Sequence, residues 1–310
     1  MTQREGQNGG VSAPAPSRAT KTKFLVGLIG DGIQGSRSPA LHEEEARHHG
    51  LTLHYELIDL ARGGRNVADL PRLIESAEGM GFDGLNITYP CKQAVLPLLD
   101  DVSDEARAID AVNTVVFRDG RRKGFNTDRA GFAVPFRKKL ADVARQTVVL
   151  VGAGGAGAAA AYAVLASGTE RLFIVDRDAE RAKNLARRMT ERLPGRLLVS
   201  ADDVASVVKR ADGVIHATPT GMLGHPGLPF DPALLRSDMW LAEIVYVPLE
   251  TELLRAAREL GCRTLDGGGM AVWQAVEAFE LFTGIKPDAP RMEAHFRGMV
   301  ARDGATALPR

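Results

Sequence analysis

Apolar segments with the composition of β-strands alternate with helical segments through the first third of the chain. The predicted strands are 23–30, 53–60, 84–88 and 111–117, and the predicted helices are 38–50, 67–80 and a stretch that starts at Pro90. Ser38 is a suitable N-cap for the first of these helices, and Pro39 is a suitable first helical residue. Strands that alternate with helices in this way favour a mainly parallel sheet covered by helices.

The same alternation starts again near the middle of the chain. The expected strands are 147–154, 171–176, 213–218 and 240–246, and the expected helices are 156–167, 179–192, 250–260 and 269–283. Two separate runs of this kind predict two α/β domains. A length of 310 residues is enough for each domain to have its own hydrophobic core.

The charge balance and the composition make two classes of binding partner unexpected, nucleic acids and anionic membranes. Lys plus Arg and Asp plus Glu both number 39, so the formal net charge is zero. A nucleic acid or an anionic membrane surface calls for a surplus of basic residues, and we therefore expect neither as a partner. The sequence also contains no apolar run of the roughly 18 to 20 residues that span a bilayer.

The N-terminal residues and the cysteines indicate in which cellular compartment the protein is expected. The first 21 residues are rich in Gly, Ser, Pro and Gln and lack the apolar core of a secretory signal, so we interpret 1–21 as a disordered tail. The only cysteines are Cys91 and Cys262, and their spacing is not that of metal ligands. Two thiols in a chain of this length indicate a reducing, cytoplasmic compartment rather than a disulfide framework.

A glycine-rich segment lies where a predicted strand turns into a predicted helix. Its residues are Gly152, Ala153, Gly154, Gly155, Ala156 and Gly157. The first, third and sixth positions fit GxGxxG, in which the glycines permit a tight turn, close approach of a pyrophosphate and close helix packing. An acidic residue about 20 positions further on completes the fingerprint. The segment therefore predicts a dinucleotide site.

Three charged residues after the next strand bear on the choice of dinucleotide. Asp176 can accept hydrogen bonds from ribose hydroxyls and repel a 2′-phosphate, which favours NAD. Arg177 could instead pair with that phosphate, while Asp178 adds a second negative charge. We expect NAD, with NADP as the alternative. Asp176 could also serve only as a cap of the following helix, which is compatible with either cofactor.

Short polar motifs follow several predicted strands. GSRSP contains Ser36 and Ser38, and NITYPCK contains Thr88 and Lys92, one helical turn apart. DAVNT and GFNTD add Asn113 and Asp128. Each motif alone is more often a cap, a turn or a solvated charge. Ligands of open α/β sheets bind outside the carboxyl ends of the strands, and the recurrence of such motifs there predicts a polar substrate site.

These motifs also carry a resemblance to a known family. The strings are SRSP, NITYPCK, AVNT, NTD, GAGGAG, HATPTGM, EIVYVPLETELL and GGGMAVWQA. In this order and spacing they resemble the shikimate/quinate dehydrogenase family from about residue 27 to residue 291. The sequence looks closest to the actinobacterial-type quinate/shikimate dehydrogenases that use NAD.

The resemblance implies a role for each matching residue. Lys92 and Asp128 would form the catalytic pair, and Ser36 and Ser38 would bind the substrate carboxylate. The ring hydroxyls would be held by Thr88, Asn113, Asp128 and Gln274. The remaining positions line the cleft or the cofactor: Tyr246, Gly267, Thr218, Pro219 and Ile244.

The resemblance also implies a fold and a reaction. A Rossmann dinucleotide-binding domain would occupy 125–265, and a discontinuous α/β substrate domain with a mainly parallel sheet would comprise 22–124 and 266–310. The family oxidises the C3 hydroxyl of shikimate or quinate, or reduces 3-dehydroshikimate or 3-dehydroquinate. Shikimate oxidation and its reverse belong to the shikimate pathway of chorismate and aromatic amino acid biosynthesis. We expect a monomer or a homodimer.

The residue types suit this chemistry. Loss of hydride from an alcohol carbon requires a base for the hydroxyl proton, and the reverse reaction requires an acid. A lysine can serve as both, and a neighbouring carboxylate can orient it. No His, Cys, Asp and Glu cluster has metal-ligand spacing, so we expect no metal.

Three departures from the family pattern leave the substrate open. Asp110 stands where the family usually has glycine, Glu243 where it has aspartate, and Cys91 where phenylalanine is common. Ser38 is typical of shikimate enzymes, whereas YPCK is similar to quinate-using members. Shikimate and quinate both remain candidates.

Three other functions are alternatives to this interpretation. One is an aminoshikimate or aminoquinate dehydrogenase of antibiotic biosynthesis, and another is a dinucleotide-binding regulator without turnover. The presence of both Lys92 and Asp128 disfavours the regulator. A methylene-tetrahydrofolate-type dehydrogenase is more distant, because SRSP and NTD argue against it.

Overall fold

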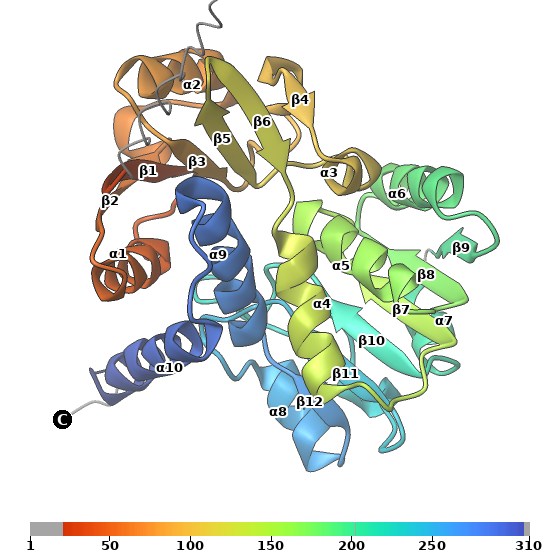
Figure 1. Ribbon diagram of the computed structural model, residues 1–310. Coiled ribbons are helices and arrows are strands. Elements are labelled where there is room, and N and C mark those ends of the chain that lie inside the picture. Colours follow the sequence, from red (N-terminus) through yellow and green to blue (C-terminus); the bar gives the residue numbers. More distant parts are fainter. Residues whose placement is uncertain (1–20, 202, 307–310) are drawn as a thin grey trace, which may run out of the picture.

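The computed structural model describes residues 21–201 and 203–306, with side chains described up to residue 302. The predicted disordered tail therefore lies, apart from Lys21, outside the described residues. Two six-stranded sheets, each covered by helices, organise the described chain (Figure 1). None of the helices in this part of the chain is both long and apolar enough to cross a membrane.

The first sheet is built by the N-terminal segment, in the order β2-β1-β3-β5-β6-β4. Its strands are β1 (Lys23–Gly30), β2 (Thr52–Asp59), β3 (Gly84–Ile87), β4 (Asp101–Val102), β5 (Thr114–Arg118) and β6 (Arg121–Phe125). β1 runs parallel to β2 and to β3, and β4 runs parallel to β6. β5 is antiparallel to both β3 and β6, so the sheet is mainly but not wholly parallel.

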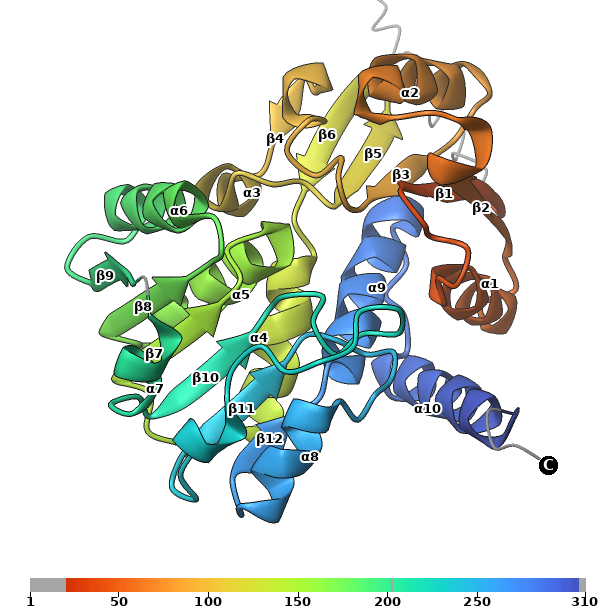
Figure 2. The same ribbon diagram turned by 180° about the vertical axis from the view of Figure 1, so that it is seen from behind.

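Helices from both ends of the chain cover this sheet. They are α1 (Ser38–His48), α2 (Leu70–Gly79), α3 (Asp104–Ile109) and α9 (Gly268–Thr283). The last helix, α10 (Ala289–Thr306), packs against α1 and α9. Ile74 of α2 packs with Ile29 and Leu85 on one face. Phe279 of α9 packs with Val26 on the other face. The C-terminal helix α9 thus completes a core that the N-terminal strands begin, as Figures 1 and 2 show.

The second sheet is entirely parallel, in the order β12-β11-β10-β7-β8-β9. Its strands are β7 (Thr147–Val151), β8 (Arg171–Val175), β9 (Leu197–Ser200), β10 (Gly213–His216), β11 (Trp240–Glu243) and β12 (Arg263–Leu265). The helices around it are α4 (Asp128–Lys139), α5 (Gly155–Ala166), α6 (Ala179–Arg192), α7 (Val204–Val208) and α8 (Glu252–Glu259). A parallel sheet covered on both faces is the doubly wound Rossmann arrangement, and the predicted fold class is confirmed.

Helices α4 and α9 pack side by side between the two sheets (Figures 1 and 2). Their backbones approach closely because glycines lie at the contact. A Cβ atom at Gly131 would lie 2.8 Å from the carbonyl oxygen of Met270, and one at Gly269 would lie 2.8 Å from Cβ of Pro135. Larger side chains at these glycines would force the two helices apart.

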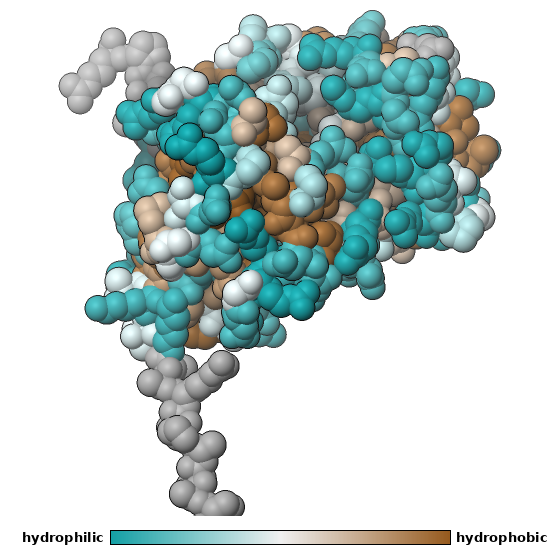
Figure 3. All heavy atoms as spheres, turned by 90° about the horizontal axis from the view of Figure 1, so that it is seen from above, coloured by the Kyte–Doolittle hydropathy of each residue, from teal (hydrophilic) through white to brown (hydrophobic). Residues whose placement is uncertain are grey.

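The view from above shows a mostly hydrophilic surface with a hydrophobic area near its middle (Figure 3). The sequence has as many basic as acidic side chains, 39 of each. A hydrophilic surface with balanced charge agrees with the absence of a basic surplus in the composition.

Two local predictions are wrong. Ser38 is the first residue of α1 rather than its N-cap; the N-cap is Arg37, and no side chain caps this end. The stretch after Pro90 forms turns and a short 3-10 helix, η3 (Leu96–Leu98), instead of an α-helix. The backbone carbonyl of Lys92 accepts a hydrogen bond from Val112 N–H at 2.9 Å, and it is therefore not available for a helical bond.

His42 on α1 is fully buried without a polar partner. Neither ring nitrogen has a hydrogen-bond partner among the described residues. The ring lies against aromatic rings, with centroids 5.0 Å from Tyr55 and 6.1 Å from Phe279. Burial lowers the pKa of His42 from 6.5 to about 3. The folded protein therefore keeps this imidazole neutral at a pH at which the unfolded chain protonates it.

This depressed pKa gives the stability a defined pH dependence. Below about pH 6.5 the unfolded state binds a proton that the folded state does not, so the free energy of unfolding falls as pH falls. The expected contribution is about 1.4 kcal/mol per pH unit, down to the folded-state pKa of about 3. When denaturant unfolding is measured at pH 7.5 and at pH 5, the free energy of unfolding should fall less between these pH values in His42→Leu than in the wild type. His54→Gln, at an exposed position, is the control, and equal losses in His42→Leu and wild type would contradict the prediction.

Candidate active site

Asp128 and Lys92 form a nearly buried ion pair. Asp128 is the first residue of α4, and its Oδ2 accepts a hydrogen bond from Lys92 Nζ at 2.5 Å. The side chains are 16% and 9% exposed for Lys92 and Asp128, respectively. The two residues lie 36 positions apart in the sequence, and the fold brings them together as predicted from the motifs.

Asn113 fixes the orientation of the Asp128 carboxylate. Its Nδ2 donates to Asp128 Oδ1 and to Thr127 Oγ1, both at 2.9 Å. Its Oδ1 accepts from the backbone N–H of Thr127 at 2.7 Å. A buried amide that bonds on both sides leaves the start of α4 little freedom to rotate.

The hydrogen-bond network continues to residues that were not singled out from the sequence. The hydroxyl of Tyr55 donates to Asn86 Oδ1 at 2.7 Å, and Asn86 Nδ2 donates to Thr114 Oγ1 at 3.0 Å. Thr114 in turn donates to Asn113 Oδ1 at 3.1 Å. The only sequence signal for this network was a polar Asn86 in the otherwise apolar strand GLNI.

The predicted carboxylate-binding serines lie at the far end of this network. Ser36 Oγ accepts a hydrogen bond from the backbone N–H of Ser38 at 3.3 Å. The side chain of Ser38 lies close to the hydroxyl of Tyr55. Tyr246, predicted to line the cleft, is partly buried and packs against Phe296. The serines thus lie next to the Tyr55 end of a hydrogen-bond network that runs to Lys92.

Thr88 and Gln274 approach the site from two other elements. A Cβ atom at Gly30 would lie 2.2 Å from the Thr88 methyl group, which places Thr88 at the end of β1. Gln274 on α9 lies against Gly131 of α4, about one turn after Asp128, and its amide donates to Ala271 O at 3.0 Å.

Of the three GxGxxG glycines in the predicted dinucleotide loop, two are required by the backbone and one is not. Gly152 has φ +105°, a value that other residues rarely adopt. A Cβ atom at Gly157 would lie 2.0 Å from the carbonyl oxygen of Gly152, whereas one at Gly154 would meet nothing within 4 Å. The loop therefore needs its first and third glycines for folding, and the second leaves an open surface.

The ion pair adjoins this loop. A Cβ atom at Gly155, the first residue of α5, would lie 3.1 Å from Cδ of Lys92. The methylene chain of Lys92 therefore rests on the helix start that would bind a pyrophosphate. An acid–base pair and a dinucleotide loop thus lie in contact.

Family models match three parts of the chain. They are described as the shikimate dehydrogenase substrate binding domain (28–115), shikimate/quinate 5-dehydrogenase (136–222) and the shikimate 5′-dehydrogenase C-terminal domain (267–295).

Individual proteins are similar over most of the chain. A shikimate dehydrogenase (NADP⁺) from Streptomyces avermitilis is 53% identical over 89% of this chain and 95% of its own length. A quinate/shikimate dehydrogenase (NAD⁺) from Corynebacterium efficiens is 49% identical over 88% of this chain and 97% of its own. The solved structure of a quinate dehydrogenase from Corynebacterium glutamicum in complex with NAD superposes with a TM-score of 0.83 at 46% identity, covering 89% of this chain and 99% of that one.

The chain belongs to the shikimate/quinate dehydrogenase family. This membership confirms the resemblance found in the motifs, and it confirms that the protein is an oxidoreductase that uses a nicotinamide dinucleotide. The comparisons do not favour a regulator without turnover or an aminoshikimate dehydrogenase.

In this dehydrogenase, the carboxylate of Asp176 supports the dinucleotide loop itself. Its oxygens accept from the backbone N–H groups of Ala153 at 2.7 Å and of Asp178 at 2.9 Å. The N-cap of α6 is Asp178, which accepts from Arg181 N–H at 3.1 Å. The alternative reading of Asp176 as that cap is therefore wrong.

A cation that the sequence analysis did not single out lies close to Asp176. Arg181 Nη1 lies 3.7 Å from Asp176 Oδ1, and its Nη2 lies 3.6 Å from Asp178 Oδ2. Arg177 is exposed at the surface. Sequence reasoning singled out Arg177 because it is adjacent to Asp176, but a residue one helical turn into α6 approaches the carboxylate instead.

The other predicted cofactor positions follow strands β10 and β11. Thr218 lies beside the dinucleotide loop, since a Cβ atom at Gly152 would lie 2.9 Å from its methyl group. Pro219 follows it at the surface. A Cβ atom at Gly267 would lie 2.3 Å from the carbonyl oxygen of Ile244, so these two positions are in contact.

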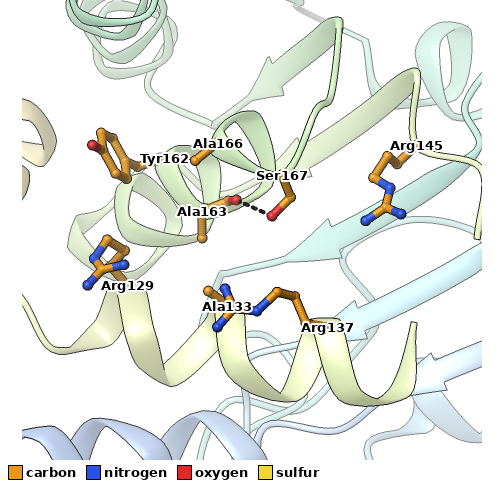
Figure 4. A pocket seen from close by; sticks show the side chains of 8 residues that line it. All are labelled: Arg129, Ala133, Arg137, Arg145, Tyr162, Ala163, Ala166 and Ser167. Carbon is orange, nitrogen blue, oxygen red and sulfur yellow. Dashed lines mark hydrogen bonds between the residues drawn. The ribbon is translucent and has the colours of Figure 1, made fainter. Parts of the chain in front are cut away.

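A separate cavity of about 250 Å³ lies between α4 and α5 (Figure 4). Its lining residues are Arg129, Ala133, Arg137, Arg145, Tyr162, Ala163, Ala166 and Ser167. None of these eight is a predicted site residue. Among the residues that the structure describes, no group of three or more His, Cys, Asp or Glu side chains could hold a metal ion.

The glycines of the loop yield a paired prediction. Gly157→Ala should lower the free energy of unfolding by about 1–3 kcal/mol, because its methyl group collides with the Gly152 carbonyl. Gly154→Ala should leave stability unchanged and weaken dinucleotide binding, because its methyl group enters the open surface that a pyrophosphate would occupy. Denaturant unfolding and NADH titration measure the two effects. The same stability loss in both variants would contradict this division.

Proposed function

We propose that this protein catalyses reversible hydride transfer between the C3 hydroxyl of shikimate or quinate and NAD. The observation that carries the proposal is the Lys92–Asp128 pair resting on Gly155, at the start of the dinucleotide-binding helix. We expect this contact to bring a proton donor and acceptor next to the bound dinucleotide, since the start of that helix would hold the pyrophosphate. Of the relatives described above, one is named for shikimate and another for both quinate and shikimate.

In the proposed mechanism, Lys92 Nζ takes the proton of the C3 hydroxyl as the alcohol is oxidised and returns it in the reverse reaction. The bound dinucleotide supplies the hydride acceptor or donor. Lys92 accepts this proton as a neutral amine, and Asp128 stabilises the ammonium group that results through the 2.5 Å hydrogen bond, while Asn113 holds Asp128. Both side chains of the pair are largely shielded from water, which keeps the proton on the reaction path.

The remaining polar residues would bind the cyclic acid. Ser36 and Ser38, at the start of α1, suit the carboxylate, since serine hydroxyls can donate hydrogen bonds to it. The ring hydroxyls would be held by Thr88, Asn113, Asp128 and Gln274. The buried hydrogen bonds from Tyr55 through Asn86 and Thr114 support a fixed distance between the carboxylate end and the Lys92 end.

The proposed domains are a substrate domain of 22–124 and 266–310 and a dinucleotide domain of 125–265. Closure of the two around the ligands would exclude water from the hydride path. All proposed site residues belong to one chain, so a monomer is sufficient and a homodimer is compatible. Both cysteines are buried and free, which agrees with the cytoplasmic location that we infer.

The preference for NAD rests on the Asp176 carboxylate. Two backbone N–H groups fix its position at the end of β8, where it would meet the adenosine ribose and repel a 2′-phosphate. Arg181 opposes this preference, because its guanidinium lies where it could pair with that phosphate. The relatives are split in the same way, one named for NADP and another for NAD.

The function is tested by steady-state kinetics with shikimate and quinate, each with NAD and NADP. We expect turnover of both acids and a higher kcat/KM with NAD.

In Lys92→Ala, kcat should fall by about 10² or more, the usual contribution of a positioned acid–base group. Dinucleotide affinity should change little. Lys139→Ala, which removes a surface lysine near Asp266, is the matched control. Near-normal turnover of Lys92→Ala would exclude the proposed role.

The cofactor preference has its own test. Asp176→Ser should raise the ratio of kcat/KM for NADP over NAD by about tenfold or more, the factor equivalent to 1.4 kcal/mol. The reason is the loss of a negative charge that would face the 2′-phosphate. Asp178→Ser is the control, since it removes a neighbouring charge that caps α6. An unchanged ratio in Asp176→Ser would show that Arg181 already governs the preference.

A further inference from the structure

A buried charged cluster lies at the carboxyl ends of β10 and β11, next to the dinucleotide loop. His216 and Glu243 are the last residues of these strands and are paired in register. Both side chains are completely buried, and His216 Nδ1 lies 2.9 Å from each carboxyl oxygen of Glu243. Burying such a pair is costly unless its hydrogen bonds are complete.

The surroundings of Glu243 supply these hydrogen bonds. Its Oε1 accepts from Val245 N–H at 3.0 Å, and its Oε2 accepts from the hydroxyl of Thr251 at 3.1 Å. Thr251 can donate this proton because its oxygen already accepts from Leu254 N–H. Both carboxyl oxygens are therefore acceptors, and the proton between Glu243 and His216 belongs on Nδ1 of the ring.

The other ring nitrogen of His216 reaches the cofactor site. Its Nε2 lies 2.5 Å from Thr218 Oγ1 and, with the ring proton on Nδ1, accepts a hydrogen bond from the Thr218 hydroxyl. The oxygen of this hydroxyl accepts from Thr220 N–H at 3.3 Å. With Nδ1 committed to Glu243, the ring cannot turn away from Thr218 without breaking the buried pair. The Thr218 hydroxyl is thereby held in one position beside Gly152.

The strand order indicates which half of the dinucleotide Thr218 would meet. β8, which is followed by Asp176, lies on one side of β7, and β10 lies on the other. The pyrophosphate sits on the helix that follows β7, and the adenosine ribose lies on the β8 side. The hydroxyl after β10 therefore faces the nicotinamide half.

We propose that the buried Glu243–His216 pair positions the Thr218 hydroxyl as a hydrogen-bonding group for the nicotinamide half of the dinucleotide. The proposal rests on the proposed function, because it assumes that the dinucleotide binds at this loop. Glu243 and His216 are positioning residues that act through Thr218, without touching the cofactor themselves. The pair should affect the affinity for the dinucleotide and not the proton transfer at Lys92.

A double-mutant cycle on NADH affinity, measured by fluorescence titration of the full chain without any cyclic acid, tests this proposal. Thr218→Val removes the hydroxyl and keeps the shape, and we expect the Kd for NADH to rise about tenfold, the loss of one hydrogen bond. Glu243→Gln provides a single acceptor oxygen where three donors converge, and the Kd should rise about fivefold. The double variant should bind no more weakly than Thr218→Val alone, because the pair acts through that hydroxyl.

Other variants separate positioning from folding. Asp212→Asn weakens a partly buried hydrogen bond to Thr147 N–H at the opposite end of the same sheet, so it should lower stability and leave the Kd unchanged. If Glu243→Gln does not fold, Glu243→Asp replaces it in the cycle, with a carboxylate one methylene further from His216. An unchanged Kd in the Glu243 variant, or additive effects in the double variant, would overturn the proposal. Failure of the wild type to bind NADH would overturn the proposed function as well.

Discussion

The carboxylate of Asp128 is the group on which the site depends. It stands at the first position of α4, the helix that follows the last strand of the first sheet, and it is bonded on one side by Lys92 and on the other by Asn113. An unpaired carboxylate in this place would be unfavourable, so the burial of Asp128 requires both partners. The same requirement brings the loop after β3, the start of β5 and the start of α4 together.

The glycine contact of α4 with α9 gives this arrangement its rigidity. Gly131 lies one turn after Asp128, and its lack of a side chain lets α9 approach with Gln274 at the contact. The polar network at the head of α4 and the packed helix pair behind it constrain the same few residues. A site of this kind is positioned by the framework of both sheets rather than by a single loop.

The sequence predicted the framework well where the hydrophobic pattern was regular. β1 and α6 have the predicted bounds. Helix α4 was missed because it contains Pro135 and ends in three charged residues, and β6 was missed because RRKGF has no apolar alternation. Motifs located the Lys92–Asp128 pair, but the bonds of Tyr55 and Asn86 depend on a register between strands that no local pattern reveals.

The position of α9 has a consequence for synthesis of the protein. Phe24 and Val26 near the N-terminus share one core with Phe279 and Phe282 near the C-terminus. A ribosome releases the N-terminal strands long before α9, and this apolar face stays uncovered while the second sheet is made. The Rossmann unit, whose contacts are closer in sequence, can fold first during translation, whereas the first sheet is completed last. The chain is thus most exposed to aggregation late in translation, when a folded second domain is tethered to an unfinished first one.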